Sequence, residues 1–123
     1  MSEPSDGDRP QAEPLPAEDE KLVTLARSAR ARSAAPEGAA VRDDMGRTYV
    51  ASTVRLQSLQ LSAVQAVVAA AVSSGSEDLE AAAVVGDRPA IDQADRVLLG
   101  ELSVRRLLVA APGRGAHVEV LEP

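Results

Sequence analysis

The amino-acid sequence predicts a layered α/β domain, because helical and strand patterns alternate along the chain. Apolar residues recur at helical spacing over residues 18–32 and 62–74, which predicts two helices. Segments 79–85 and 104–110 contain the apolar runs 81–85 and 107–110, which are typical of buried strands. Helices that alternate with such strands pack against the faces of a sheet, so the order of the patterns indicates the fold class.

Each element has its own signal. Helix 18–32 begins with acidic residues and ends with arginines, an order that complements the helix dipole. Strands 39–43 and 47–53 follow, and Gly46 suits a tight hairpin turn between them. Helix 62–74 is apolar on almost every side, which is typical of a core or of a subunit interface, and Gly75 should end it. Strand 79–85, helix 92–102 and strands 104–110 and 117–121 complete the expected order.

Length and charge divide the 123 residues into one tail and one domain. Residues 1–17 contain four prolines and few apolar side chains, so we expect a disordered acidic tail. Residues 18–123 form the predicted domain. The first twenty residues hold seven acidic side chains and one arginine, which accounts for the whole net charge of −6. Two interpretations of the tail stay open: a solubilising extension, or an acidic peptide that docks on a basic partner.

Composition argues against several classes of function. From residue 21 onward twelve basic side chains balance twelve acidic ones, without the clustered basic excess that binds nucleic acid. The longest apolar run, 66–72, is far shorter than the roughly 20 residues that cross a membrane, and residues 1–17 show no export signal. The sequence has no cysteine, which fits a reducing cytoplasm. Twelve arginines against one lysine indicate a GC-rich bacterial genome.

Three short segments carry a resemblance to a known family. APEGAA (35–40), GRTY (46–49) and AVSSG (71–75) follow one another in an order and spacing that is similar to the cytidine deaminase superfamily, over about residues 22–110. The resemblance implies a three-layer αβα sandwich with a mixed five-stranded sheet. It also implies a homo-oligomer, either a dimer or a tetramer.

The same resemblance implies that the catalytic residues are absent. Where the family carries its CAE triplet, with a zinc-binding cysteine and a proton-transferring glutamate, this chain has Ser62-Ala63-Val64. The cysteines of the family's PCxxC motif fall at Ile91 and Ala94. A neutral hydroxyl is a poor zinc ligand, and valine has no proton to transfer. We therefore expect no metal, no other cofactor and no catalysis, with Val64, Ile91 and Ala94 packed where the metal would lie.

The family's nucleoside-binding NVEN segment corresponds here to TVRL (53–56), so that its asparagine and glutamate become Thr53 and Arg55. The resemblance thus implies a vestigial pocket. Its expected positions are Thr53, Arg55, Ser62, Val64, Ile91 and Ala94.

Other chemistry has weaker support. His117 is the one histidine, and it lies in a short terminal strand without a nucleophile motif, which favours a surface or edge residue over a catalytic one. Asp43 and Asp44 lie side by side in the expected hairpin turn, where we expect both carboxylates to face solvent.

Three hypotheses of function follow. The favoured one is a non-catalytic, deaminase-like accessory or regulatory protein that acts as a homo-oligomer, or with an unidentified protein partner, through packing around helix 62–74. The second is a sensor module that binds a nucleoside or nucleotide without converting it. The third is an active cytidine deaminase with an atypical metal site.

Overall fold

The computed structural model describes residues 15–87, 91–113 and 116–121. The predicted tail, residues 1–17, lies outside the described residues except for its last three.

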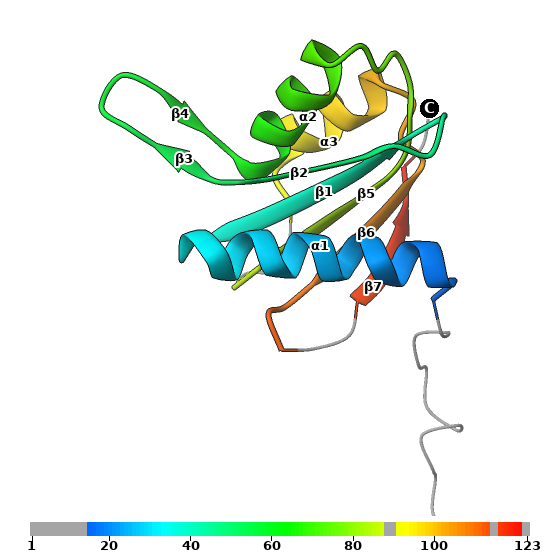
Figure 1. Ribbon diagram of the computed structural model, residues 1–123, viewed down its shortest axis with the longest axis horizontal. Coiled ribbons are helices and arrows are strands. Elements are labelled where there is room, and N and C mark those ends of the chain that lie inside the picture. Colours follow the sequence, from blue (N-terminus) through cyan, green and yellow to red (C-terminus); the bar gives the residue numbers. More distant parts are fainter. Residues whose placement is uncertain (1–14, 88–90, 114–115, 122–123) are drawn as a thin grey trace, which may run out of the picture.

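Five strands form one mixed sheet in the order β2-β1-β5-β6-β7 (Figure 1). β1 (Glu37–Asp43) pairs antiparallel with both β2 (Thr48–Ser52) and β5 (Leu79–Gly86). β5 runs parallel to β6 (Arg106–Ala110), and β7 (Ala116–Val120) returns antiparallel at the far edge. The mixed five-stranded sheet is therefore confirmed, and the ends of the predicted elements agree with the structure to within two residues.

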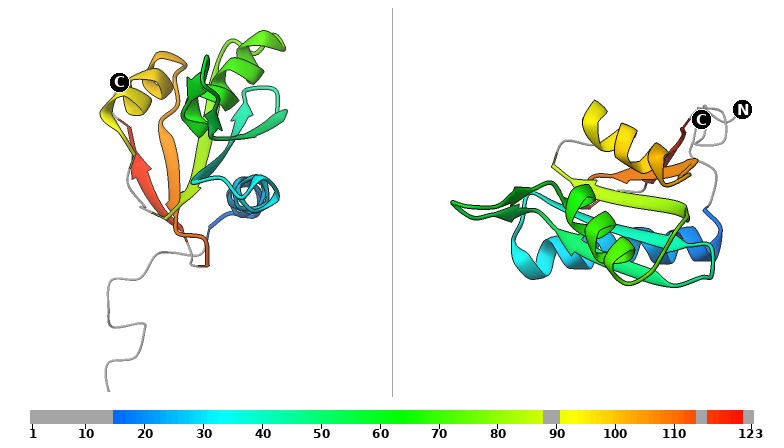
Figure 2. Two further views of the ribbon diagram at one scale, coloured as in Figure 1. Left: turned by 90° about the vertical axis from the view of Figure 1, so that its left-hand side faces the viewer. Right: turned by 90° about the horizontal axis from the view of Figure 1, so that it is seen from above.

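Helices cover both faces of the sheet, which confirms the three-layer sandwich (Figure 2, left). α1 (Ala17–Ser33) packs on one face, while α2 (Ala63–Ser73) and α3 (Gln93–Glu101) pack on the other. Each side has its own core of small aliphatic residues. The core under α1 includes Leu22, Val23, Ala26, Ala40, Ala81, Ala83 and Leu108, and the core under α2 and α3 includes Val41, Val64, Val67, Val84, Leu99, Leu107 and Val109.

The N-terminal end of α1 is fixed to the sheet by charge. Asp19 is buried in the first turn of the helix, 3% exposed. Its carboxylate accepts hydrogen bonds from Arg42 on β1, at 3.3 Å, and from Nε of Arg106 on β6, at 2.8 Å. A buried carboxylate needs such partners, so this group holds α1 across two strands that are not neighbours in the sheet.

The turn between β1 and β2 is built around a buried carboxylate, so the expectation that Asp43 faces solvent is wrong. Asp43 is fully buried, and the register of β1 against β5 shifts between Arg42 and Asp43. Its Oδ1 accepts from the amides of Met45 and Arg47, and its Oδ2 accepts from Arg47 Nε and Ser76 Oγ, at 2.8 to 3.0 Å. The carboxylate thus accepts hydrogen bonds from turn amides in the way that a backbone carbonyl oxygen otherwise would. Asp44, by contrast, is exposed as expected.

A small second sheet was not predicted from the sequence. β3 (Val54–Arg55) and β4 (Gln60–Leu61) form a two-stranded hairpin that projects from the body of the domain and leads into α2 (Figure 1). Strands of two residues are too short to show an alternating pattern, which explains why the sequence gives no signal there. None of the helices in the described part of the chain is long and apolar enough to cross a membrane.

Candidate functional site

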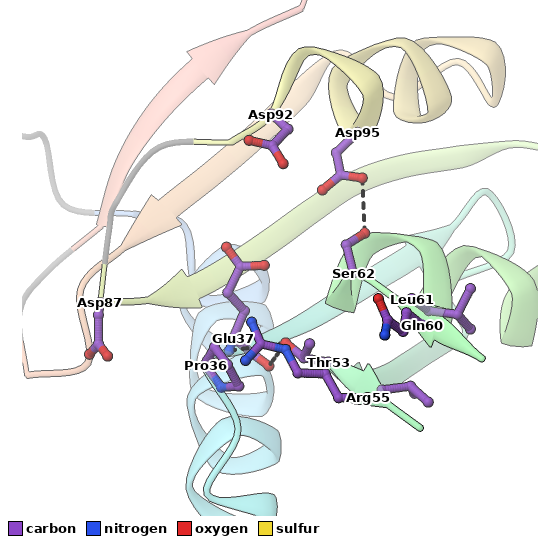
Figure 3. A pocket seen from close by; sticks show the side chains of 11 residues that line it. Pro36, Glu37, Thr53, Arg55, Gln60, Leu61, Ser62, Asp87, Asp92 and Asp95 are labelled. Atoms are coloured by element: carbon purple, nitrogen blue, oxygen red, sulfur yellow. Dashed lines mark hydrogen bonds between the residues drawn. The ribbon is translucent and has the colours of Figure 1, made fainter. Parts of the chain in front are cut away.

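A cavity of about 540 Å³ lies beside the N-termini of α2 and α3 (Figure 3). The start of β1, the ends of β2 and β5 and the base of the β3–β4 hairpin complete its walls. Cavities of this size hold small molecules. The lining residues are Pro36, Glu37, Thr53, Val54, Arg55, Gln60, Leu61, Ser62, Asp87, Asp92 and Asp95.

Ser62 joins the two helices that border the cavity. It is the N-cap of α2, where its Oγ accepts from the amide of Gln65 at 3.0 Å while the Gln65 side chain accepts from the Ser62 amide at 2.8 Å. This capping box satisfies amides that the first helical turn leaves unpaired. The same hydroxyl donates a hydrogen bond to Asp95 Oδ1 in α3, at 2.9 Å. The N-termini of α2 and α3 are therefore linked directly through two side chains.

Two aspartates of α3 give the cavity its acidic end. Asp95 is 6% exposed. Burial raises the pKa of Asp95, the hydrogen bond from Ser62 lowers it, and the nearby charge of Asp92 raises it, so that the net direction is upward. Asp92 is the N-cap of α3, but its side chain makes no capping hydrogen bond, and its carboxylate points into the cavity (Figure 3).

The opposite wall is held by Thr53. Its Oγ1 accepts from the amide of Glu37 at 3.2 Å and donates to the carbonyl of the same residue at 3.3 Å, which closes the open end of the β1–β2 pair. Arg55 extends from the exposed β3 strand. Asp87 lies at the rim and is paired with Arg30 of α1 at 2.8 Å.

Of the six positions predicted for a vestigial pocket, three line the cavity: Thr53, Arg55 and Ser62. Val64 and Ile91 are buried, 1% and 8% exposed, and belong to the core under α2 and α3. Ala94 is exposed on α3, so the expectation that it packs with them is wrong. Glu37 and Asp95 were not predicted to belong to the site, although the spacing of Asp92 and Asp95, one turn apart on a helix, is a signal that could have identified Asp95.

The side chains around the cavity do not fit a zinc ion. Zinc in proteins is held by thiolates, imidazoles and carboxylates. The sequence offers no cysteine, and its single histidine, His117, lies on the edge strand β7, exposed and 3.2 Å from Glu119. Within residues 15–87, 91–113 and 116–121, no group of three His, Cys, Asp or Glu side chains is arranged to hold a metal. The position of His117 confirms that it is an edge residue.

Comparison with known proteins identifies relatives of this chain. The family model described as cytidine deaminase-like matches residues 15–115. The solved cytidine deaminase of Mycobacterium tuberculosis is 29% identical, with a TM-score of 0.68 over 86% of this chain and 92% of that one. The enzyme of Mycobacterium leprae is 26% identical, with a TM-score of 0.60 over 80% and 91%. The enzyme of Burkholderia pseudomallei, 22% identical, shares the fold with a TM-score of 0.74 over 83% and 91%. No curated protein matches the chain in sequence.

Proposed function

The chain belongs to the cytidine deaminase-like family, and from that premise we propose that it is a non-catalytic member that acts as an accessory or regulatory protein. One observation carries the proposal. Val64 and Ile91, which occupy the positions that the resemblance assigns to the proton-transferring glutamate and to a zinc-binding cysteine, are hydrocarbon side chains buried in the core.

The chemistry of hydrolytic deamination supports this proposal. That reaction needs a metal-activated water and a side chain that carries a proton to and from the base. Neither Val64 nor Ile91 can supply these functions, and the hydroxyl of Ser62 is already engaged in capping α2 and in binding Asp95. Asp92 and Asp95 are able to move protons, but the hydrolytic deamination of a nucleobase uses a metal-bound water, and the residues described around the cavity do not form a group that could hold that metal.

The test is a deaminase assay. We expect no conversion of cytidine or deoxycytidine by the full chain, with or without added zinc, under conditions in which the Mycobacterium tuberculosis enzyme is active. Conversion that disappears in Ser62→Ala or Asp92→Asn would overturn the proposal. Conversion that survives both substitutions would indicate a contaminating enzyme, and a mock purification provides that control.

A second candidate function is favoured by the cavity itself. A non-catalytic protein does not need a substrate pocket. A cavity of about 540 Å³ nevertheless lies between the N-termini of α2 and α3 and the β3–β4 hairpin. A cavity of this volume with several polar side chains is typical of a small-molecule site. We therefore propose a ligand-responsive module as the alternative, in which binding at the cavity would change the contacts of α2, α3 or the hairpin.

We further propose that the protein is a cytoplasmic homo-oligomer. The absence of cysteine supports a reducing compartment. Exposed apolar side chains support assembly: Leu56 and Leu59, in the loop of the β3–β4 hairpin, are 58% and 47% exposed. The predicted role of helix α2 in assembly has less support, because most of its apolar residues are buried within the protomer and Val72 alone is a large exposed apolar side chain on it.

A further inference from the structure

We propose that the edge strand β7 pairs antiparallel with β7 of a second copy, across a two-fold axis at Val118. The inference rests on the proposed homo-oligomer and names a second contact within it. This contact is separate from the β3–β4 hairpin, which follows β2 at the opposite edge of the sheet (Figure 1). One copy can therefore use both contacts at once.

The backbone of β7 provides the first observation. β7 is the last strand of the sheet, and no described strand pairs with its outer side. The amide of Leu121 donates to the carbonyl of Arg105 at 2.7 Å, so the backbone groups of Leu121 point toward the β6 side. Because these directions alternate along a strand, the amides and carbonyls of Ala116, Val118 and Val120 point outward. An antiparallel partner strand would satisfy them.

The side chains of β7 provide the second observation. Val118 lies opposite Leu108 in the register of β6 and β7, so its side chain is on the face of the sheet that packs on α1. α1 lies toward the β1 side of that face and leaves β7 uncovered (Figure 2, left). Val118 and Val120 are accordingly 37% and 68% exposed. A second copy beside β7 would bring the two pairs of valines together and reduce their contact with water.

Charge selects the register of the pairing. With the axis at Val118, His117 lies opposite Glu119 of the second copy, at a position without backbone hydrogen bonds, where opposite side chains are closest. An axis at Glu119 would oppose two carboxylates, which is destabilising. Within one copy, Glu119 Oε2 lies 3.2 Å from His117 Nε2, so the pairing extends an existing contact across the axis. The axis at Val118 also pairs all five residues of β7.

β7 lacks the features by which proteins prevent edge strands from pairing. Such strands carry a lysine, a proline or a bulge. Residues 116–120 contain neither lysine nor proline, and their register with β6 is continuous. The edge is therefore open to a second strand.

The size of the contact determines which assembly it forms. Two five-residue strands bury much less than the roughly 1,000 Å² of a stable interface, so single copies pair only weakly through β7. Two copies joined through the hairpin carry two β7 strands, and two such dimers would meet through two contacts at once. This simultaneous binding raises the affinity without any new contact. β7 pairing thus converts a hairpin dimer into a tetramer.

A cysteine at the two-fold axis traps the pairing directly, because the chain has no cysteine of its own. Opposite residues that share backbone hydrogen bonds have Cα atoms about 5.5 Å apart, which a disulfide can span. With oxidised glutathione as the oxidant, we expect Val118→Cys to form a covalent dimer several-fold faster than Val50→Cys. Val50 is the matched control, since it is 36% exposed at the centre of β2, the other edge strand.

A proline at position 118 tests the backbone hydrogen bonds. Val118→Pro removes an amide that points away from β6, a place where edge strands tolerate proline. Val118→Thr keeps this amide and the branched shape of the side chain. In sedimentation velocity of the full chain we expect tetramers for wild type and Val118→Thr and a hairpin dimer for Val118→Pro. Circular dichroism melts report whether each variant folds.

Each other result has a defined meaning. Equal cross-linking at positions 118 and 50, or a tetramer that persists in Val118→Pro, would overturn β7 pairing. A wild-type dimer that Leu56→Ser/Leu59→Ser dissociates, without cross-linking at position 118, would reject β7 pairing and keep the homo-oligomer. A monomeric wild type that still cross-links at position 118 would reject the stable homo-oligomer and keep the pairing. A monomer without cross-linking would reject both.

Discussion

Asp43 stabilises the turn between β1 and β2, and its ionisation makes the stability of the fold depend on pH. Burial alone would raise the pKa of this carboxyl, but hydrogen bonds from Ser76, Arg47 and Met45 favour the charged form and lower the pKa from 3.8 to about 2. The folded protein therefore binds a proton at position 43 less readily than the unfolded chain does. The turn between β1 and β2, and its contact with Ser76 after α2, depend on the carboxylate being ionised.

This difference predicts a defined window of acid sensitivity. Because the pKa of Asp43 is depressed in the folded state, its ionisation stabilises the fold fully above the unfolded value near 3.8, and this contribution is lost as pH falls toward 2. Asp43→Asn should therefore destabilise the protein at pH 7, and the difference from wild type should shrink between pH 4 and 2. Urea unfolding of both proteins across that pH range measures the difference in their free energies of unfolding.

The neighbouring residue provides the control for this measurement. Asp44→Asn makes the same chemical change on an exposed side chain and should leave both the stability and its pH dependence close to wild type. The free energies of unfolding of wild type and Asp43→Asn are compared at each pH. If their difference stays constant down to pH 2, the acid sensitivity does not come from Asp43.

Single residues also show how much of the site the sequence could predict. Thr53, Arg55 and Ser62 were located by their order relative to family motifs, and all three line the cavity. Asp95 was missed because its role depends on Ser62, which lies 33 positions earlier and meets it only when α2 and α3 start side by side. The burial of Asp43 was missed for the same reason, since Ser76 comes from a distant loop.

Among the elements, α1 and β1 approach so closely that one position requires glycine. A Cβ atom on Gly38 would overlap the carbonyl oxygen of Ala26 and would lie 2.6 Å from the amide nitrogen of Arg30. Both of those atoms belong to the backbone of α1, which cannot shift without disturbing its contact with the sheet. The small buried side chains of the helix, Ala26 and Ala29, are what allow this approach.

A pair of glycine substitutions tests this packing. Gly38→Ala should lower the free energy of unfolding by about 3 kcal/mol or prevent folding, because overpacked sites force backbone movement. Gly100→Ala, in α3, adds a methyl group that meets nothing within 4 Å and should raise it by roughly 0.5–1 kcal/mol through helix propensity. Chemical denaturation measures both. Similar stabilities of the two variants would mean that α1 can move away from β1 at little cost.

The elements with the strongest signal in the sequence have a periodic or continuous apolar pattern. The three helices, β5 and β6 have such a pattern, whereas β1 and β2 were predicted as short strands on either side of a turn at Gly46. The β3–β4 hairpin has no such pattern, because its strands are two residues long and its loop mixes leucines with polar side chains. Its conformation depends on where β2 ends and α2 begins, which is information from the tertiary fold.

At the scale of the whole molecule, the β3–β4 hairpin stands apart from the three packed layers of the sandwich. It projects from the sandwich in both side and top views (Figures 1 and 2). A hairpin this short has little stability of its own in water. Leu56 donates a backbone hydrogen bond to Leu59 at 2.8 Å, and both side chains are exposed. Burying the exposed half of each leucine against a second copy would contribute roughly 1–1.5 kcal/mol, which favours assembly through this hairpin.

Assembly through the hairpin predicts a selective effect of its two leucines. In sedimentation velocity we expect the wild-type chain to form a dimer or tetramer at micromolar concentration. The double variant Leu56→Ser/Leu59→Ser should be monomeric, or should dissociate with a Kd at least about 100-fold higher, because roughly 3 kcal/mol of burial is lost. Val97→Ser removes a more exposed apolar side chain, 61% exposed on α3, and should leave the assembly intact. A wild-type chain that is monomeric would contradict the proposed homo-oligomer. If Val97→Ser dissociates the oligomer and the leucine variant does not, the interface lies at α3 instead of the hairpin.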